Sequence, residues 1–304
     1  MEKEQITATE LAKINEIRNL FNPFIKDIKL NKFKIKHLPN HKSYSLFGII
    51  SDYLIRYLFL KKIKENYLVE SDDFINKLTE TTEEIIAYKS FNILINYSSY
   101  YDPDNIQEKE FSKFKERLNE EISNYLFKNE KDLFELFKTI YILSISDIIF
   151  RVGKKEYILN SLNNFLEFEE FLSNKNNKKY DNLFEDFKNI YENLNILLKN
   201  DLKIKNFKLN PSLGLTESNI LIKADADLIL EDTLVEIKTS KDPNVKNDYL
   251  EQLLIYVLLY FKKTGKIIKD FKIINPRATN LITFKISWDK DLYNNFKNTL
   301  NNFF

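Results

Sequence analysis

Apolar residues recur at every third or fourth position through most of the first two hundred residues, and this spacing predicts a mostly helical region. Clusters of polar residues at 102–105 and 173–179 predict loops between the helices. The predicted helices cover residues 11–21, 46–63, 74–97, 111–127, 133–150 and 183–198.

A short exception lies between residues 31 and 37, where Lys32, Lys34 and Lys36 alternate with apolar residues. This period of two predicts an isolated strand with one basic face. A solvated edge strand has the same pattern, because lysines are common on exposed sheet edges.

After Asn200 the pattern changes to a period of two and to short apolar runs. Asp248 and Glu251 are spaced as a capping box at the start of one helix, and Gly265 follows its end. The order of elements predicts an α/β fold, in which helices flank a mixed sheet. Strands are predicted to end near Leu209 and to span 219–230, 233–239, 271–275 and 281–286, with the helix at 249–263.

The composition, 43% hydrophobic and 30% charged over 304 residues, is that of a globular protein of about two domains. The apolar runs are shorter than the ~18 residues that a membrane span needs. The polar start, Met1 to Glu4, is unlike a signal peptide. We therefore expect a cytoplasmic protein that has no membrane partner.

The residue types narrow the possible chemistry. The chain has no cysteine and only two histidines, His37 and His41, so thiol nucleophiles and cysteine–zinc sites are excluded. Pro39 lies between the histidines and favours a loop there. The four glycines are too far apart for a P-loop or a dinucleotide-binding motif. With a net charge of +1, contact with nucleic acid must come from local lysine clusters.

The segment 224–238, ADADLILEDTLVEIK, carries the strongest candidate chemistry. Two strands joined by a two-residue turn would place Asp227 directly opposite Glu236, with Cβ atoms about 4.5–5.5 Å apart. Two carboxylates at this spacing repel each other unless a cation lies between them. By the same register Lys238 lies on the same face, opposite Asp225.

These groups suffice for phosphodiester hydrolysis, because a hard cation polarises the phosphoryl oxygen and activates water while a lysine stabilises the developing charge. A salt-bridged hairpin on a solvated surface, in which Lys238 pairs with Asp225 or Glu236, has the same spacing. The apolar residues that flank the charges favour a buried central sheet. Because it costs free energy to bury a charge, charges in such a sheet favour a functional site over a surface hairpin.

The D-(x)n-E-x-K pattern, followed by the helical run from Gln252 to Tyr256, resembles the PD-(D/E)XK nuclease superfamily, particularly its RecB-like branch with a Q-x-x-x-Y motif. The resemblance covers about a third of the chain. It implies that Asp227 and Glu236 bind Mg²⁺ or Mn²⁺ and that Lys238 assists the attacking water. It also implies that Gln252 and Tyr256 border the metal or the DNA, although on one helical face they equally fit a buried hydrogen-bonded pair.

RecB-like enzymes also carry an upstream helix of the form G-x-x-x-H, whose histidine is a further metal ligand. The run from Gly48 to Asp52 resembles this element with aspartate in the histidine position, which implies a third ligand at Asp52. Asp52 also fits an ordinary surface residue of a helix. If this helix belongs to the core, the chain divides into an N-terminal helix and arm (1–40), a nuclease core (41–69 and 201–304) and a helical insertion (70–200).

The leading hypothesis is a Mg²⁺- or Mn²⁺-dependent nuclease that acts on DNA. The usual roles of the family that the chain resembles imply phage defence or DNA processing. The second is a catalytically silent relative that binds nucleic acid or a protein through the same fold. The third is a helical interaction module with an incidental α/β tail, which would lack metal affinity. The helical insertion has two open roles, to clamp a nucleic acid strand or to bind a protein partner.

Overall fold

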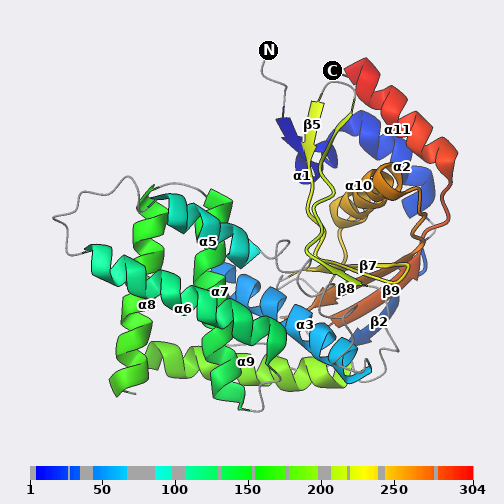
Figure 1. The fold of residues 1–304 in the computed structure, drawn as a ribbon. Helices are drawn as coiled ribbons and strands as arrows, with labels where there is room; N and C mark the ends of the chain where they lie inside the picture. Colours follow the sequence, from blue (N-terminus) through cyan, green and yellow to red (C-terminus); the bar gives the residue numbers. More distant parts are fainter. Residues whose placement is uncertain are drawn as a thin grey trace. The chain divides into compact units, whose positions relative to one another are not determined.

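Figure 1 shows the computed structural model of the chain, which divides into two compact units. Residues 1–36 and 206–304 form one unit, called the α/β unit, and residues 37–205 form the other, called the helical unit. The structure describes residues 5–26, 28–34, 44–66, 86–97, 107–128, 132–152, 155–174, 178–197, 207–217, 220–238, 244–276 and 280–303.

The α/β unit contains two sheets, with strand orders β2-β9-β8-β7-β6-β3 and β1-β5-β4. In the larger sheet, β7 and β8 are parallel and all other neighbours are antiparallel. The expected mixed sheet with flanking helices is therefore present. The strands are β1 (Gln5–Thr7), β2 (Asn31–Lys34), β3 (Phe207–Leu209), β4 (Leu215–Glu217), β5 (Ile220–Lys223), β6 (Leu228–Leu230), β7 (Thr233–Ile237), β8 (Asp270–Asn275) and β9 (Asn280–Lys285).

Helix α10 (Asn247–Thr264) makes the crossover that parallel strands β7 and β8 require. Every residue from Leu250 to Tyr260 is buried, because β7 covers one side of the helix and α1 (Ala8–Leu11) and α2 (Asn15–Ile25) cover others (Figure 1). The polar residues in this stretch are consequently held inside the unit, where each needs a partner.

The two ends of α10 differ in how well the sequence predicted them. Gly265 follows the helix with a φ of 71°, the left-handed conformation expected there. The expected capping box is wrong, because the helix begins before Asp248 and its N-cap is Lys246, which makes no side-chain cap bond. Glu251 forms an ion pair with Arg18 instead.

The single strand expected over residues 219–230 is also wrong. It is divided into β5 and β6, which belong to different sheets, and the chain bends between them. The Ala224 carbonyl accepts hydrogen bonds from the Leu213 and Gly214 amides, which ties two parts of the chain together at this bend. A Cβ at Gly214 would lie 2.9 Å from the Ile222 carbonyl oxygen, so only glycine fits this approach without a shift of the backbone.

Helix α11 (Lys290–Phe303) and strands β1 and β4 were not predicted. The strands have three residues each, too few for a clear period. Helix α11 is rich in asparagine, which has a low helix propensity, and its stability comes from burial of Leu292, Phe296 and Leu300. Strand β2 forms one edge of the larger sheet, and its basic neighbours beyond Lys34 lie outside the described residues, as do both histidines.

The helical unit is built around α7 (Leu133–Val152), which contacts α3, α5, α6, α8 and α9. These contacts bury α7 on all sides, as its nearly continuous apolar sequence requires. Helix α3 thus belongs to the helical unit, whereas residues 41–69 were expected in the core with the sheet. Of the helix expected at 74–97, residues 86–97 are helical and 74–85 lie outside the described residues. The other helices are α3 (Tyr44–Asn66), α5 (Ile86–Tyr97), α6 (Gln107–Phe127), α8 (Lys155–Asn174) and α9 (Lys178–Leu197).

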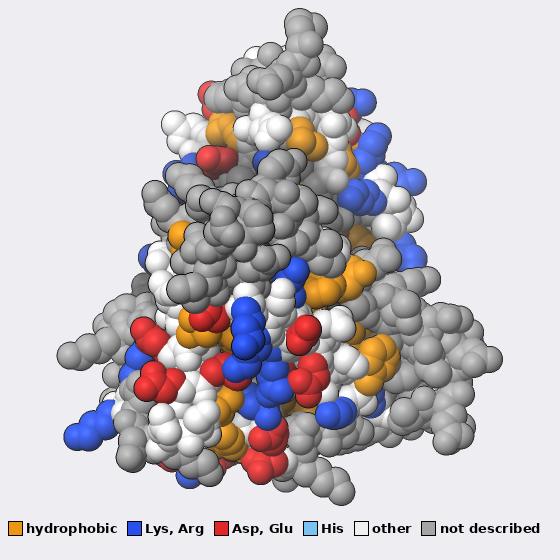
Figure 2. Space-filling view, turned by 60° about the vertical axis from the view of Figure 1, so that its left-hand side comes forward, with side chains coloured by type: hydrophobic (Ala, Val, Ile, Leu, Met, Phe, Trp, Pro, Cys, Tyr) orange, Lys and Arg blue, Asp and Glu red, His pale blue; other side chains and the backbone are white. Residues whose placement is uncertain are grey.

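Charges of opposite sign lie close together on the helical unit. Figure 2 shows lysine and arginine side chains with acidic side chains beside them on the face in view. The ion pairs include Lys113 with Glu169 and Arg117 with Glu121, both at 2.8 Å. Such pairing leaves little net charge to attract a polyanion there. Among the described helices, none is long and apolar enough to span a membrane.

Candidate active site

The hairpin of β6 and β7 has the register that the sequence predicts. Leu230 pairs with Thr233 and Leu228 with Val235, so the connecting turn contains two residues. Continued by one residue, this register brings Asp227 opposite Glu236. The expected even loop length is confirmed.

Asp227 is fixed to the end of β7 by a hydrogen bond from a backbone amide. The Ile237 N–H donates to Asp227 Oδ2 at 2.6 Å, and the Asp227 carbonyl accepts from the Asn210 N–H at 2.8 Å. Because Ile237 lies between Glu236 and Lys238, this bond holds the aspartate beside the E-x-K segment.

Lys238 connects the hairpin with helix α10. Its Nζ donates to Glu236 Oε1 at 2.6 Å and to Gln252 Oε1 at 2.8 Å. The ammonium also lies 5.1 Å from the centre of the Tyr249 ring, within the range of a cation–π contact. The Lys238 side chain keeps 20% of its accessible surface, so the site remains open to solvent on one side.

The surroundings of Lys238 act on its charge in opposite directions. Burial lowers its pKa, but the negative charges of Glu236 and Asp227 outweigh burial and raise the pKa above its ordinary value. Lys238 is therefore cationic at neutral pH. In this state it can stabilise negative charge and orient a water molecule, but it cannot accept a proton.

Gln252 orients the lysine and is itself held by two hydroxyl groups. Its Nε2 donates to Tyr256 OH at 2.9 Å and to Thr9 Oγ1 at 2.7 Å. Gln252 and Tyr256 thus form the hydrogen-bonded pair that helical spacing allows, and they lie directly behind the charged cluster. Thr9, on the short helix α1, was not predicted as a site residue, because it lies far from Gln252 in the sequence and belongs to no motif.

The cluster offers a hard divalent cation two carboxylates. Mg²⁺ prefers oxygen ligands and is commonly held by one or two carboxylates together with waters and substrate phosphates. Glu236 already binds one cation, the Lys238 ammonium, and Asp227 is held beside the same segment by the Ile237 N–H. Within the described residues no group of three or more acidic, histidine or cysteine side chains is placed to hold a metal. Water or substrate would supply the remaining ligands.

Two other residues were named from the sequence. Asp225 lies before β6, where it is exposed and forms an isolated β-bridge with Ser212, and its pairing with Lys238 stays a prediction. Asp52 belongs to α3 in the helical unit, where its Oδ2 lies 3.2 Å from Arg56 Nη2. The structure therefore brings together Asp227, Glu236, Lys238, Gln252 and Tyr256 and gives Asp52 a local partner.

No protein-family model, curated protein or solved structure matches this chain.

Proposed function

We propose that this chain is a Mg²⁺- or Mn²⁺-dependent nuclease that hydrolyses phosphodiester bonds of DNA. The observation that supports this proposal is that Asp227, held by the Ile237 N–H, lies beside the Glu236–Lys238 ion pair at the end of a hairpin of two internal strands of the larger sheet. Glu236 is only 4% exposed, and a buried carboxylate requires compensation by positive charge. Burial of these charged groups costs free energy of folding, and clusters of this kind commonly serve a function.

Each residue has a role in this proposal. Bound Mg²⁺ would polarise the phosphoryl oxygen and lower the pKa of a coordinated water. Asp227 and Glu236 supply the carboxylates for the ion. Lys238 stays protonated and stabilises the negative charge that develops on the phosphoryl group, while Gln252 and Thr9 fix its position.

A second candidate function is a nuclease-like protein that binds nucleic acid or a protein without cleaving a bond. The bond of 2.6 Å between Lys238 and Glu236 supports it, because an ion pair with a glutamine clamp is stable without a metal. The two candidates differ in one respect. Catalysis requires that a divalent ion compete with Lys238 for Glu236, whereas a silent protein has no such requirement.

Cleavage assays test the proposal directly. The full chain is incubated with labelled linear and circular DNA and with matched RNA, in Mg²⁺, in Mn²⁺ or in EDTA. We expect divalent-dependent cleavage of DNA that is lost in Glu236→Gln, which removes the charge and keeps the shape. Binding without cleavage under every condition would support the second candidate, a nuclease-like protein without activity. Cleavage of RNA alone would show that the substrate is RNA and not DNA.

A further inference from the structure

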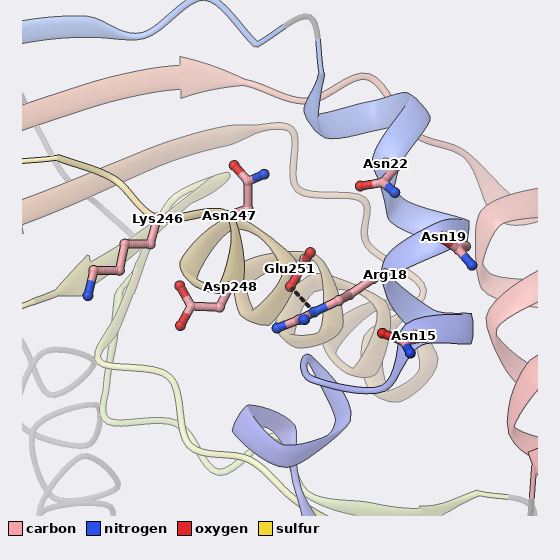
Figure 3. A pocket seen from close by; sticks show the side chains of 8 residues that line it. All are labelled: Asn15, Arg18, Asn19, Asn22, Lys246, Asn247, Asp248 and Glu251. Carbon is pink, nitrogen blue, oxygen red and sulfur yellow. Dashed lines mark ion pairs between the residues drawn. The ribbon is translucent and has the colours of Figure 1, made fainter.

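A polar pocket of about 510 Å³ lies between α2 and the first turns of α10 (Figure 3). Asn15, Asn19 and Asn22 line it from α2, and their spacing places them along one side of that helix. Arg18 extends from the same helix toward α10. The volume falls within the ~300–1,000 Å³ that small-molecule sites have.

The charges of this pocket cancel. Arg18 and Lys246 are matched by two carboxylates, those of Asp248 and Glu251. A phosphate group would therefore meet as much repulsion as attraction. The asparagine amides each offer both donors and acceptors, so the lining suits a neutral ligand with several hydrogen-bonding groups.

Two buried oxygen atoms of residues that line the pocket, Asp248 Oδ1 and Glu251 Oε2, accept no hydrogen bond within the described residues. A buried acceptor without a partner is costly, and a ligand N–H would remove that cost. Glu251 is already engaged, because Arg18 Nε lies 3.3 Å from its Oε2 and also donates to the Ala12 carbonyl oxygen. The two remaining nitrogens of the Arg18 guanidinium carry further donors for a ligand.

The pocket adjoins the candidate active site through α10. Glu251 lines the pocket and the next residue, Gln252, binds Lys238. Asp248 lines the pocket and the next residue, Tyr249, contacts the Lys238 ammonium. Both sites therefore lie on the same turns of one helix, whose diameter with side chains is about 10–12 Å. A nucleotide strand that crosses these turns would pass both sites.

We propose that the pocket binds an unpaired nucleobase of the strand whose phosphate lies at the Asp227, Glu236 and Lys238 cluster. This inference rests on the proposed function and specifies its substrate as single-stranded or locally opened nucleic acid. A paired base has its hydrogen-bonding edge occupied, so only an unpaired base can use the amides and Asp248. The base would occupy the neutral polar pocket, and the phosphate would lie beside the Lys238 ammonium.

Binding in EDTA tests the proposal without cleavage. Fluorescence anisotropy compares a short labelled single-stranded oligonucleotide with a strand of the same length in which every base is replaced by an abasic residue. We expect the native chain to bind the first strand about 5- to 150-fold more tightly, the range that base contacts provide. Asn19→Ala and Asp248→Asn should weaken binding of the base-containing strand and leave that of the abasic strand unchanged.

Two matched variants on α11 serve as controls. Asp291 occupies the second position of α11 as Asp248 does in α10, and Asn298 is an exposed asparagine of the same helix. Asp291→Asn and Asn298→Ala should keep the native preference. Equal binding of both strands by the native chain would overturn the base pocket, as would an unchanged preference in the pocket variants. If the native chain binds neither strand and cleaves nothing, the proposed function fails as well. If it cleaves nucleic acid while the preference is absent, the base pocket alone fails.

Discussion

The carboxylate of Asp227 accepts a hydrogen bond from the backbone N–H of Ile237 at 2.6 Å. This contact joins the residue before β6 to the last residue of β7, between the glutamate and the lysine of the E-x-K segment. It uses one carboxylate oxygen, Oδ2, and so orients the group relative to Glu236 and Lys238. The site is therefore shaped by the hairpin backbone as well as by its side chains.

Mn²⁺ should stabilise the native chain against heat, because the folded hairpin holds the carboxylates of Asp227 and Glu236 together for the ion and the unfolded chain does not. At a hundredfold excess over the dissociation constant the gain is about 2.7 kcal/mol. Thermal melts in EDTA and in Mn²⁺ measure it. Glu236→Gln should lose the gain, while Asp232→Asn, an exposed carboxylate in the adjacent turn, should keep it. An equal shift in all three proteins would mean that the ion binds elsewhere.

Lys238→Ala should lower the rate of DNA cleavage by about 100- to 1,000-fold, the usual cost of losing one charge-stabilising donor. Lys208→Ala removes an exposed lysine from β3 and should leave the rate unchanged. Single-turnover cleavage measures the chemical step, and circular dichroism reports whether each variant is folded. A folded Lys238→Ala protein with the native rate would exclude Lys238 from the mechanism.

Thr9→Val should slow cleavage about fivefold, because it removes the acceptor that fixes Gln252 Nε2 and a hydrogen bond contributes about 1 kcal/mol. Thr9 acts through Gln252 and is a positioning residue, so we expect kcat to fall while KM stays constant. Thr9→Ser keeps the hydroxyl and should restore the native rate. Thr216→Val, at an exposed position of β4, provides the control. A rise in KM alone would indicate that Thr9 contacts substrate.

Asp52→Asn should destabilise the helical unit by about 1–3 kcal/mol, because Arg56 is 3% exposed and would lose a charged partner. Urea unfolding measures this loss. The same variant also tests the third metal ligand implied by the resemblance. Weaker Mn²⁺ binding in Asp52→Asn would support that ligand role, and unchanged Mn²⁺ binding would leave Asp52 with its structural role in α3.

Lys64 should make the stability of the chain depend on pH. Burial lowers its pKa from 10.5 to about 8, so between these values the unfolded chain holds a proton that the folded chain does not. Stability from this group therefore rises with pH across that window and is lost as pH falls through about 8. At pH 7, Lys64→Met should be more stable than the native chain by about 3 kcal/mol.

This advantage of Lys64→Met should shrink as pH approaches 10.5. Urea unfolding at a series of pH values measures the difference. Lys178→Met, which removes an exposed lysine, should show no such trend. A constant difference between Lys64→Met and the native chain over the whole range would mean that Lys64 is protonated throughout.

Local sequence determined the parts of this protein that depend on neighbouring residues. The hairpin register follows from the two-residue turn between β6 and β7, and Gly265 ends α10 because it adopts a positive φ without strain. The helical spacing of Gln252 and Tyr256 likewise placed their side chains together. In each case the deciding interaction spans a few residues.

Tertiary structure decided what depends on contacts between distant segments. Residues 219–230 form two strands because β5 pairs with β1 and β4 whereas β6 pairs with β3 and β7. Glu251 pairs with Arg18, which is distant in the sequence, and not with the start of its own helix. Thr9 reaches Gln252 across 243 positions of sequence. Because α10 is buried on several sides, its polar side chains find their partners on other elements. The spacing of residues in the sequence does not identify which distant side chain will bind a buried polar group.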